Sequence, residues 1–151
     1  MPEIEVSRTV NASVERVWEV FTDLSQAAER LTGVERIEVL TPGGFKVGTT
    51  WRETRVMHGK SSVEQLTVTV CEPPGRYLVE ARNRGTHYRT EFTFTSAGDE
   101  ETLVRMVFGA EPHGAVGKVV GAVFGSLAGR AVTRVMQQDL EDLATAAEKP
   151  A

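Results

Sequence analysis

Alternation of hydrophobic and polar residues dominates the chain from residue 3 to residue 110. Residues 3–10 place Ile4 and Val6 on one face and Glu3 and Glu5 on the other, which predicts a half-buried strand. The stretch 34–110 is rich in Val, Thr, Phe and Tyr and is interrupted by short turns rich in Gly and Pro. These turns predict six antiparallel strands, at 34–40, 47–57, 61–71, 76–83, 86–95 and 101–110.

Helical spacing follows the first strand. Ser13 can cap a helix whose apolar residues recur at intervals of three and four: Val14, Val17, Trp18 and Phe21. Asp23, with Gln26 three residues later, resembles a capping box and begins a second short helix that we expect to stop at Gly33. Trp18 and Phe21 lie on the inner stripe, so we expect them to anchor the core.

Residues 111–149 predict one long closing helix with two different halves. In the second half, apolar residues recur at intervals of three and four: Val132, Met136, Leu140, Leu143 and Ala147. The opposite side is polar: Arg134, Gln138, Glu141 and Glu148. The first half carries a glycine at every fourth residue: Gly117, Gly121, Gly125 and Gly129. Each costs roughly 1 kcal/mol of helix propensity, so the stripe indicates either close packing of another backbone or room for a ligand.

The alternation also assigns the strand faces that should meet this helix. The inner residues are Leu66, Val68 and Val70 in 61–71; Tyr77, Val79 and Ala81 in 76–83; Tyr88, Thr90, Phe92 and Phe94 in 86–95; and Val104, Met106, Phe108 and Ala110 in 101–110. Strand 47–57 carries charge on both faces. If Trp51 points inward, Glu53 and Arg55 come with it, and a partly buried ion pair is costly unless it is satisfied. The orientation of this strand stays open.

Length and charge narrow the class of protein. With 151 residues, 1–151 is expected to form a single domain, and a net charge of −4 argues against a nucleic-acid partner. The lone Cys71 and an N-terminus without a signal-peptide pattern predict a cytoplasmic protein. The apolar run 119–129 is too short for a membrane span. We expect a monomer or a weak homodimer.

Sequence motifs for catalysis and for metal or cofactor binding are missing. The sequence has no G-x-S-x-G, dinucleotide loop or H-E-x-x-H, and its three histidines are scattered, so we expect no cofactor and no metal site. A loose polar set remains: Glu53, Arg55, Glu64, Tyr77, His87 and Tyr88. These residues are either sheet-face charges and core tyrosines, or cavity groups whose shifted pKa values support proton transfer.

The chain resembles the START-like, or helix-grip, superfamily (SRPBCC), and within it the bacterial polyketide cyclase/dehydrase-like branch. The resemblance rests on the element order and on segments 14–23, 47–53, 70–74, 111–114 and 139–143. It implies an α+β fold of β-α-α-β6-α order, in which a curved seven-stranded antiparallel sheet surrounds a long C-terminal helix over an internal cavity. It carries over no catalytic motif, and the catalytic residues are unknown.

The resemblance leaves two main functions open, with a protein-interaction role as a third. The first is binding of a hydrophobic small molecule, lipid-like or polyketide-like, in the cavity under helix 115–147. The second is a polyketide cyclase/dehydrase-type enzyme that uses acid and base residues of the cavity. The ligand-binding residues that we expect are Trp51, Glu53, Tyr77, Tyr88, Phe92, Met106, Phe108, Gly121, Phe124 and Gly125.

Overall fold

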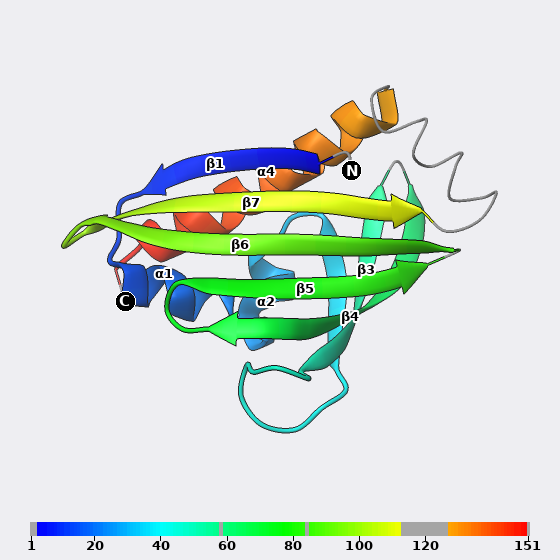
Figure 1. Ribbon diagram of the computed structural model, residues 1–151, viewed down its shortest axis with the longest axis horizontal. Helices are drawn as coiled ribbons and strands as arrows, with labels where there is room; N and C mark the ends of the chain where they lie inside the picture. Colours follow the sequence, from blue (N-terminus) through cyan, green and yellow to red (C-terminus); the bar gives the residue numbers. More distant parts are fainter. Residues whose placement is uncertain (1–2, 58, 84, 113–126, 151) are drawn as a thin grey trace.

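The computed structural model describes residues 3–57, 59–83, 85–112 and 127–150, and its elements follow the predicted order (Figure 1). They are β1 (Glu3–Val10), α1 (Val14–Phe21), α2 (Leu24–Arg30), β2 (Val34–Val39), β3 (Thr50–Met57), β4 (Lys60–Glu72), β5 (Arg76–Asn83), β6 (Thr86–Gly98), β7 (Glu101–Pro112) and α4 (Leu127–Glu148). The first half of the predicted closing helix, with Gly117, Gly121 and Gly125, lies outside the described residues. None of the described helices combines the length and apolar character that a membrane crossing requires.

The strands form one antiparallel sheet in the order β1-β7-β6-β5-β4-β3-β2. The loop 40–49 joins β2 to β3, and short turns join β3 to β7 in sequential order. Because β1 pairs with β7, β1 and β2 lie at opposite edges. In Figure 1 strands β5 to β7 run side by side, while β3 and the part of β4 that pairs with it curve away from them. Side chains of α1, α2 and α4 form one core with the inner face of this curved sheet. The predicted helix-grip α+β fold is confirmed.

Both short helices begin at the predicted caps. The Ser13 hydroxyl accepts a hydrogen bond from the Arg16 backbone N–H at 3.2 Å, and the Asp23 carboxylate accepts one from the Ser25 N–H at 3.1 Å. The second helix ends earlier than predicted, at Arg30, because Leu31 already has extended backbone geometry and leads the chain into β2. The two short helices connect β1 to β2, the strands at opposite edges of the sheet.

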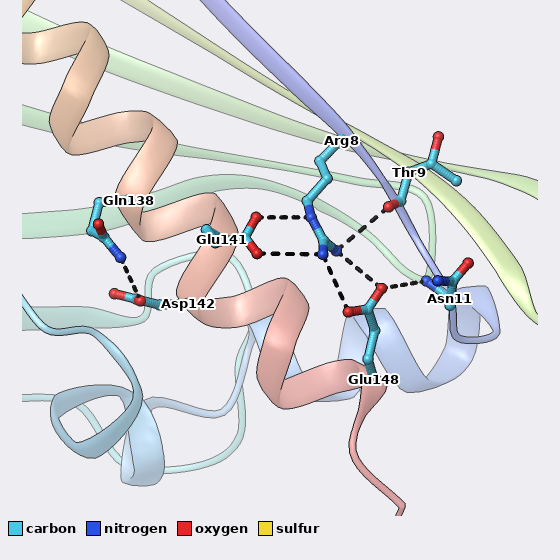
Figure 2. A network of polar contacts seen from close by, with 7 residues as sticks. All are labelled: Arg8, Thr9, Asn11, Gln138, Glu141, Asp142 and Glu148. Atoms are coloured by element: carbon cyan, nitrogen blue, oxygen red, sulfur yellow. Dashed lines mark hydrogen bonds and ion pairs between the residues drawn. The ribbon is translucent and has the colours of Figure 1, made fainter.

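The apolar stripe of α4 packs as predicted, and its buried residues are Met136, Leu140, Leu143, Ala144 and Ala147. Glu148, which was assigned to the polar side, is turned towards β1 instead (Figure 2). Its carboxylate accepts hydrogen bonds from Arg8 Nη1 at 3.0 Å and from the Asn11 N–H at 2.9 Å. The assignment was wrong because Arg8 projects from the inner face of β1 and attracts the carboxylates of the last helical turns.

One inner-face assignment in β4 was also wrong. Val68 pairs with Val79, but the register then shifts, so that Val70 pairs with Leu78 and Cys71 with Tyr77. Because paired residues of antiparallel strands point to the same face, Cys71 takes the inner position and Val70 the outer one. Cys71 packs against the core in the place predicted for Val70.

Candidate ligand-binding cavity

A cavity of about 410 Å³ lies between the inner face of the sheet and the helices. Every strand from β2 to β7 contributes to its lining, together with α2, α4 and the last residue of α1. Most of the lining side chains are aliphatic or aromatic, among them Leu31, Ile37, Phe45, Leu66, Val79, Val135 and Met136. Such a lining can surround an apolar molecule and remove it from water.

Aromatic rings form a large part of the wall. Tyr77 stacks on Phe92 with ring centroids 4.5 Å apart, and Phe45 meets Tyr77 edge-on at 4.9 Å. Tyr88 stacks on Phe108 at 5.8 Å. These stacked and edge-on contacts hold the rings against one another in the cavity wall.

The structure places seven of the ten expected ligand-binding residues around this cavity: Trp51, Glu53, Tyr77, Tyr88, Phe92, Met106 and Phe108. Gly121, Phe124 and Gly125 lie outside the described residues. The structure gives the positions of the seven residues and not the molecule that they contact. A ligand-binding role for all ten residues stays a prediction.

The two expected core anchors occupy different positions. Trp18 meets the rings of Tyr77 and Phe94 edge-on, at 5.8 and 5.7 Å, and packs against the core without lining the cavity. Phe21 is buried in the core and also reaches the cavity wall. Phe21 therefore packs in the core and also forms part of the surface of the cavity.

Strand β3 turns its Trp51 face inward, which answers the question that the sequence left open. Trp51, Glu53, Arg55 and Met57 all line the cavity. The Trp51 Nε1–H points to Glu53 Oε1 at 3.4 Å, so the indole helps to hold this carboxylate. The charged residues of β3 thus enter the cavity together with the tryptophan.

Arg55 is held by two carboxylates. Its Nε donates to Glu53 Oε2 at 2.7 Å, and its Nη1 and Nη2 donate to the two oxygens of Asp139 at 3.1 and 2.7 Å. The side chains of Arg55, Glu53 and Asp139 are only 21%, 13% and 14% exposed. The bidentate geometry is the arrangement in which a guanidinium binds a carboxylate most strongly. The three hydrogen bonds from Arg55 help to offset the cost of the inward-facing ion pair.

Asp139 was missed in the sequence. It comes from α4, three residues after Met136 and seven after Val132, both of which line the cavity. This spacing puts Asp139 on the inner stripe of the helix, so helical periodicity could have found it. Burial raises the pKa of Asp139, and the hydrogen bonds from Arg55 limit that rise. Burial also opposes the charge of Arg55, but Asp139 and Glu53 outweigh it and raise the pKa of the guanidinium, which stays positive.

Glu64 adds a third carboxylate to the cavity wall. It stands directly opposite Glu53 in the β3–β4 pair, so both side chains share the inner face. Burial raises the pKa of Glu64, and the neighbouring charge of Glu53 raises it further. Burial also raises the pKa of Tyr77, helped by the charge of Glu53, so its hydroxyl stays protonated and can donate a hydrogen bond.

Of the loose polar set, only His87 lies away from the cavity. Its Nε2 is 2.5 Å from Glu80 and its Nδ1 is 3.7 Å from Glu111, on the outer face of the sheet. His87 thus fits the interpretation as a sheet-face charge, whereas the other five members of the set line the cavity.

The comparisons with known proteins agree with this architecture. A family model described as "Polyketide cyclase / dehydrase and lipid transport" matches residues 1–148. The solved structure of TTHA0849 from Thermus thermophilus is 26% identical, with a TM-score of 0.70, covering 97% of this chain and 94% of that chain. The sequence matches no curated protein.

Two further solved structures share the fold at lower identity. The Zhui aromatase/cyclase from Streptomyces sp. R1128 is 18% identical with a TM-score of 0.71, covering 97% of this chain and 93% of that chain. Truncated norcoclaurine synthase from Thalictrum flavum is 15% identical with a TM-score of 0.75, covering 99% of this chain and 95% of that chain. At these identities the likeness concerns the fold alone. The resemblance drawn from the sequence segments is confirmed.

Proposed function

Because this chain belongs to the polyketide cyclase / dehydrase and lipid transport family, we propose that it binds a hydrophobic small molecule, lipid-like or polyketide-like, between the sheet and α4. The observation that carries the proposal is the cavity of about 410 Å³ with its largely apolar and aromatic lining. Its volume falls within the range of roughly 300–1,000 Å³ that is typical of small-molecule sites. Each Å² of apolar surface that enters such a site contributes about 25 cal/mol.

The lining suggests how a ligand would lie. Its apolar body would pack on the aromatic wall formed by Phe45, Tyr77 and Phe92. Its polar group would meet the charged end of the cavity at Glu53 and Arg55, since an unpaired polar group is costly elsewhere in the cavity. This arrangement needs no change in the fold.

A fluorescence titration with the neutral dye N-phenyl-1-naphthylamine tests the proposal. We expect one dye per chain and a free energy of unfolding raised by about 2.7 kcal/mol at a dye concentration 100 times the dissociation constant. Thr90→Phe puts a ring into the cavity and should weaken binding by about tenfold or more, because it occupies ligand volume. Thr95→Phe is the matched control, since Thr95 is exposed on the same strand.

Comparison of the two variants with the wild-type protein shows whether the dye binds in the cavity. Binding that survives Thr90→Phe unchanged would contradict the cavity as the site. Absence of dye binding by the folded wild-type protein would contradict the proposed function itself. Equal losses in both variants would point to a dye site outside the cavity.

A second candidate, a cyclase/dehydrase-type enzyme, is favoured by one specific observation. Glu64 and Tyr77 line the same cavity, and both have raised pKa values. A carboxylate with a raised pKa is a better general base, and a protonated phenol can donate to a carbonyl oxygen. Turnover of a polyketide-like carbonyl compound by the wild-type protein, lost in Glu64→Gln, would favour the enzyme over the carrier.

A further inference from the structure

The charges on the cavity wall are unbalanced. Among the described residues that line it, three are acidic, Glu53, Glu64 and Asp139, and one is basic, Arg55. Arg55 is already committed, because its guanidinium donates to Glu53 at 2.7 Å and to both oxygens of Asp139. Glu64 accepts a hydrogen bond from the Asn83 side chain and is within reach of the charge of Arg55, but no basic group among the described lining residues pairs with it alone. The described part of the cavity wall therefore carries more acidic than basic side chains.

The strand pairing concentrates this charge. Glu53 and Glu64 are direct partners across β3 and β4, an arrangement that is destabilising for two like charges. A positive charge placed between them would relieve the repulsion. Arg55, two residues after Glu53 on β3, is bound by Glu53 and by Asp139 of α4.

Two further features of the wall suit a cation. The aromatic faces of Tyr77 and Phe92 are negatively polarised, and aromatic faces beside carboxylates are a common way to bind an ammonium group. The Tyr77 side chain is only 4% exposed and lines the cavity. Its hydroxyl oxygen can accept a hydrogen bond from an N–H group of a ligand.

We propose that the ligand is an amphiphile with a cationic nitrogen, such as a protonated amine, on an apolar body. The nitrogen lies between Glu53 and Glu64, and the apolar body packs on the aromatic wall. A ligand carboxylate is disfavoured, because it would bring a further negative charge to carboxylates whose one basic partner is already paired. This inference rests on the proposed function and specifies its ligand class.

The test compares three ten-carbon probes that differ only in the head group: decylamine, decanol and decanoate. Each displaces N-phenyl-1-naphthylamine at pH 7, below its micelle concentration. We expect decylamine to bind about tenfold more tightly than decanol, the gain typical of one partly buried charge pair, and decanoate to bind most weakly. Because the apolar chain is the same, the differences report the head group alone.

Two charge-neutralising variants locate the effect. Glu64→Gln should reduce the preference for decylamine over decanol by severalfold while the affinity for decanol stays the same. Glu80→Gln is the matched control, because Glu80 pairs with His87 on the outer face of the sheet and should leave all three affinities unchanged. A preference that falls equally in both variants would mean that long-range charge, and not the cavity, is responsible, and would overturn the assignment.

The outcomes also separate this inference from the proposed function. If decanol binds but decylamine binds no more tightly, or decanoate binds best, the ligand class is wrong and the binding function stands. If neither the dye nor any of the probes binds, both fail. The wild-type comparison decides the ligand class even if a variant does not fold.

Discussion

Glu64 and Glu80 lie on opposite faces of the sheet, and their surroundings shift their pKa values in opposite directions. Burial, and then the charge of Glu53, raises the pKa of Glu64. A hydrogen bond from Thr69 lowers the pKa of Glu80, and although its partial burial opposes this, the hydrogen bond and charge of His87 lower it further. The ionised form of Glu64 therefore costs folding free energy, while the ionised form of Glu80 contributes it.

Glu64→Gln should raise the free energy of unfolding at pH 7 by about 0.5 kcal/mol, the size of an unfavourable cross-strand pair of like charges. The folded pKa of Glu64 lies above its ordinary value of 4.5, so the penalty disappears below that pH and appears as the pH rises through the folded pKa. The gain of the variant should therefore vanish at acidic pH. Urea unfolding at several pH values measures it.

Glu80→Gln gives the opposite sign in the same experiment. The folded pKa of Glu80 lies below 4.5, so its contribution is present at pH 7 and is lost as the pH falls through the folded pKa. We expect a loss of about 0.5–1 kcal/mol at pH 7 that shrinks in acid. Equal signs for the two variants would contradict the assignment of the two glutamates to different environments.

At the scale of the element, polar contacts hold α4 on two sides, to β1 and to the loop between α2 and β2. Arg8 of β1 reaches Glu141, at 2.9 Å from Nε, and Glu148 on the last turns of the helix (Figure 2). On the other side, Asp142 accepts hydrogen bonds from the Thr32 N–H and hydroxyl at 2.9 and 2.8 Å. Since the apolar stripe alone permits sliding, these polar contacts fix the position of the helix along the sheet.

Arg8→Met should lower the free energy of unfolding by about 1–2 kcal/mol, because two carboxylates lose a half-buried guanidinium. Arg105→Met is the comparison, since Arg105 pairs with Glu5 across β7 and β1 while the two side chains are 46% and 51% exposed. An exposed pair of this kind contributes less than about 1 kcal/mol. Denaturant unfolding of both variants measures the difference, and an equal cost would argue against a special role of Arg8 in seating α4.

At the scale of the whole molecule, the ion pair between Arg55 and Asp139 connects β3 to α4 across the cavity. Both side chains line the cavity, so helix and sheet are joined here by a polar contact. Glu53 completes the arrangement by binding the Arg55 Nε at 2.7 Å.

Arg55→Met should cost about 2–3 kcal/mol at pH 7, because it leaves Glu53 and Asp139 buried without a positive charge. Adding Glu53→Leu and Asp139→Leu to this variant should recover most of the loss, since replacing all charged partners by apolar ones removes the unpaired charges. Melting curves and denaturant unfolding compare the three proteins. No recovery in the triple variant would mean that the guanidinium stabilises the fold through its packing.

Much of the architecture follows from local pattern in the sequence. Periods of two and of three to four residues predict β5 with its observed bounds and the buried stripe of α4, and side-chain capping predicts where α1 begins. Five of the expected ligand-binding residues line the cavity for the same reason, because alternation alone assigns the faces of their strands: Tyr77, Tyr88, Phe92, Met106 and Phe108. These features depend on residues that are close together in the chain, so they can be predicted from the sequence.

Only the tertiary structure settled the rest. The register shift in β4 exchanges Val70 for Cys71, and the partner of Arg55 is Asp139, 84 residues away along the chain. Which face of β3 turns inward likewise depended on whether its charges would find partners on α4. Charge pairing and strand register depend on which distant segments of the chain meet in the folded protein. The local pattern of polar and apolar residues does not say which segments these are.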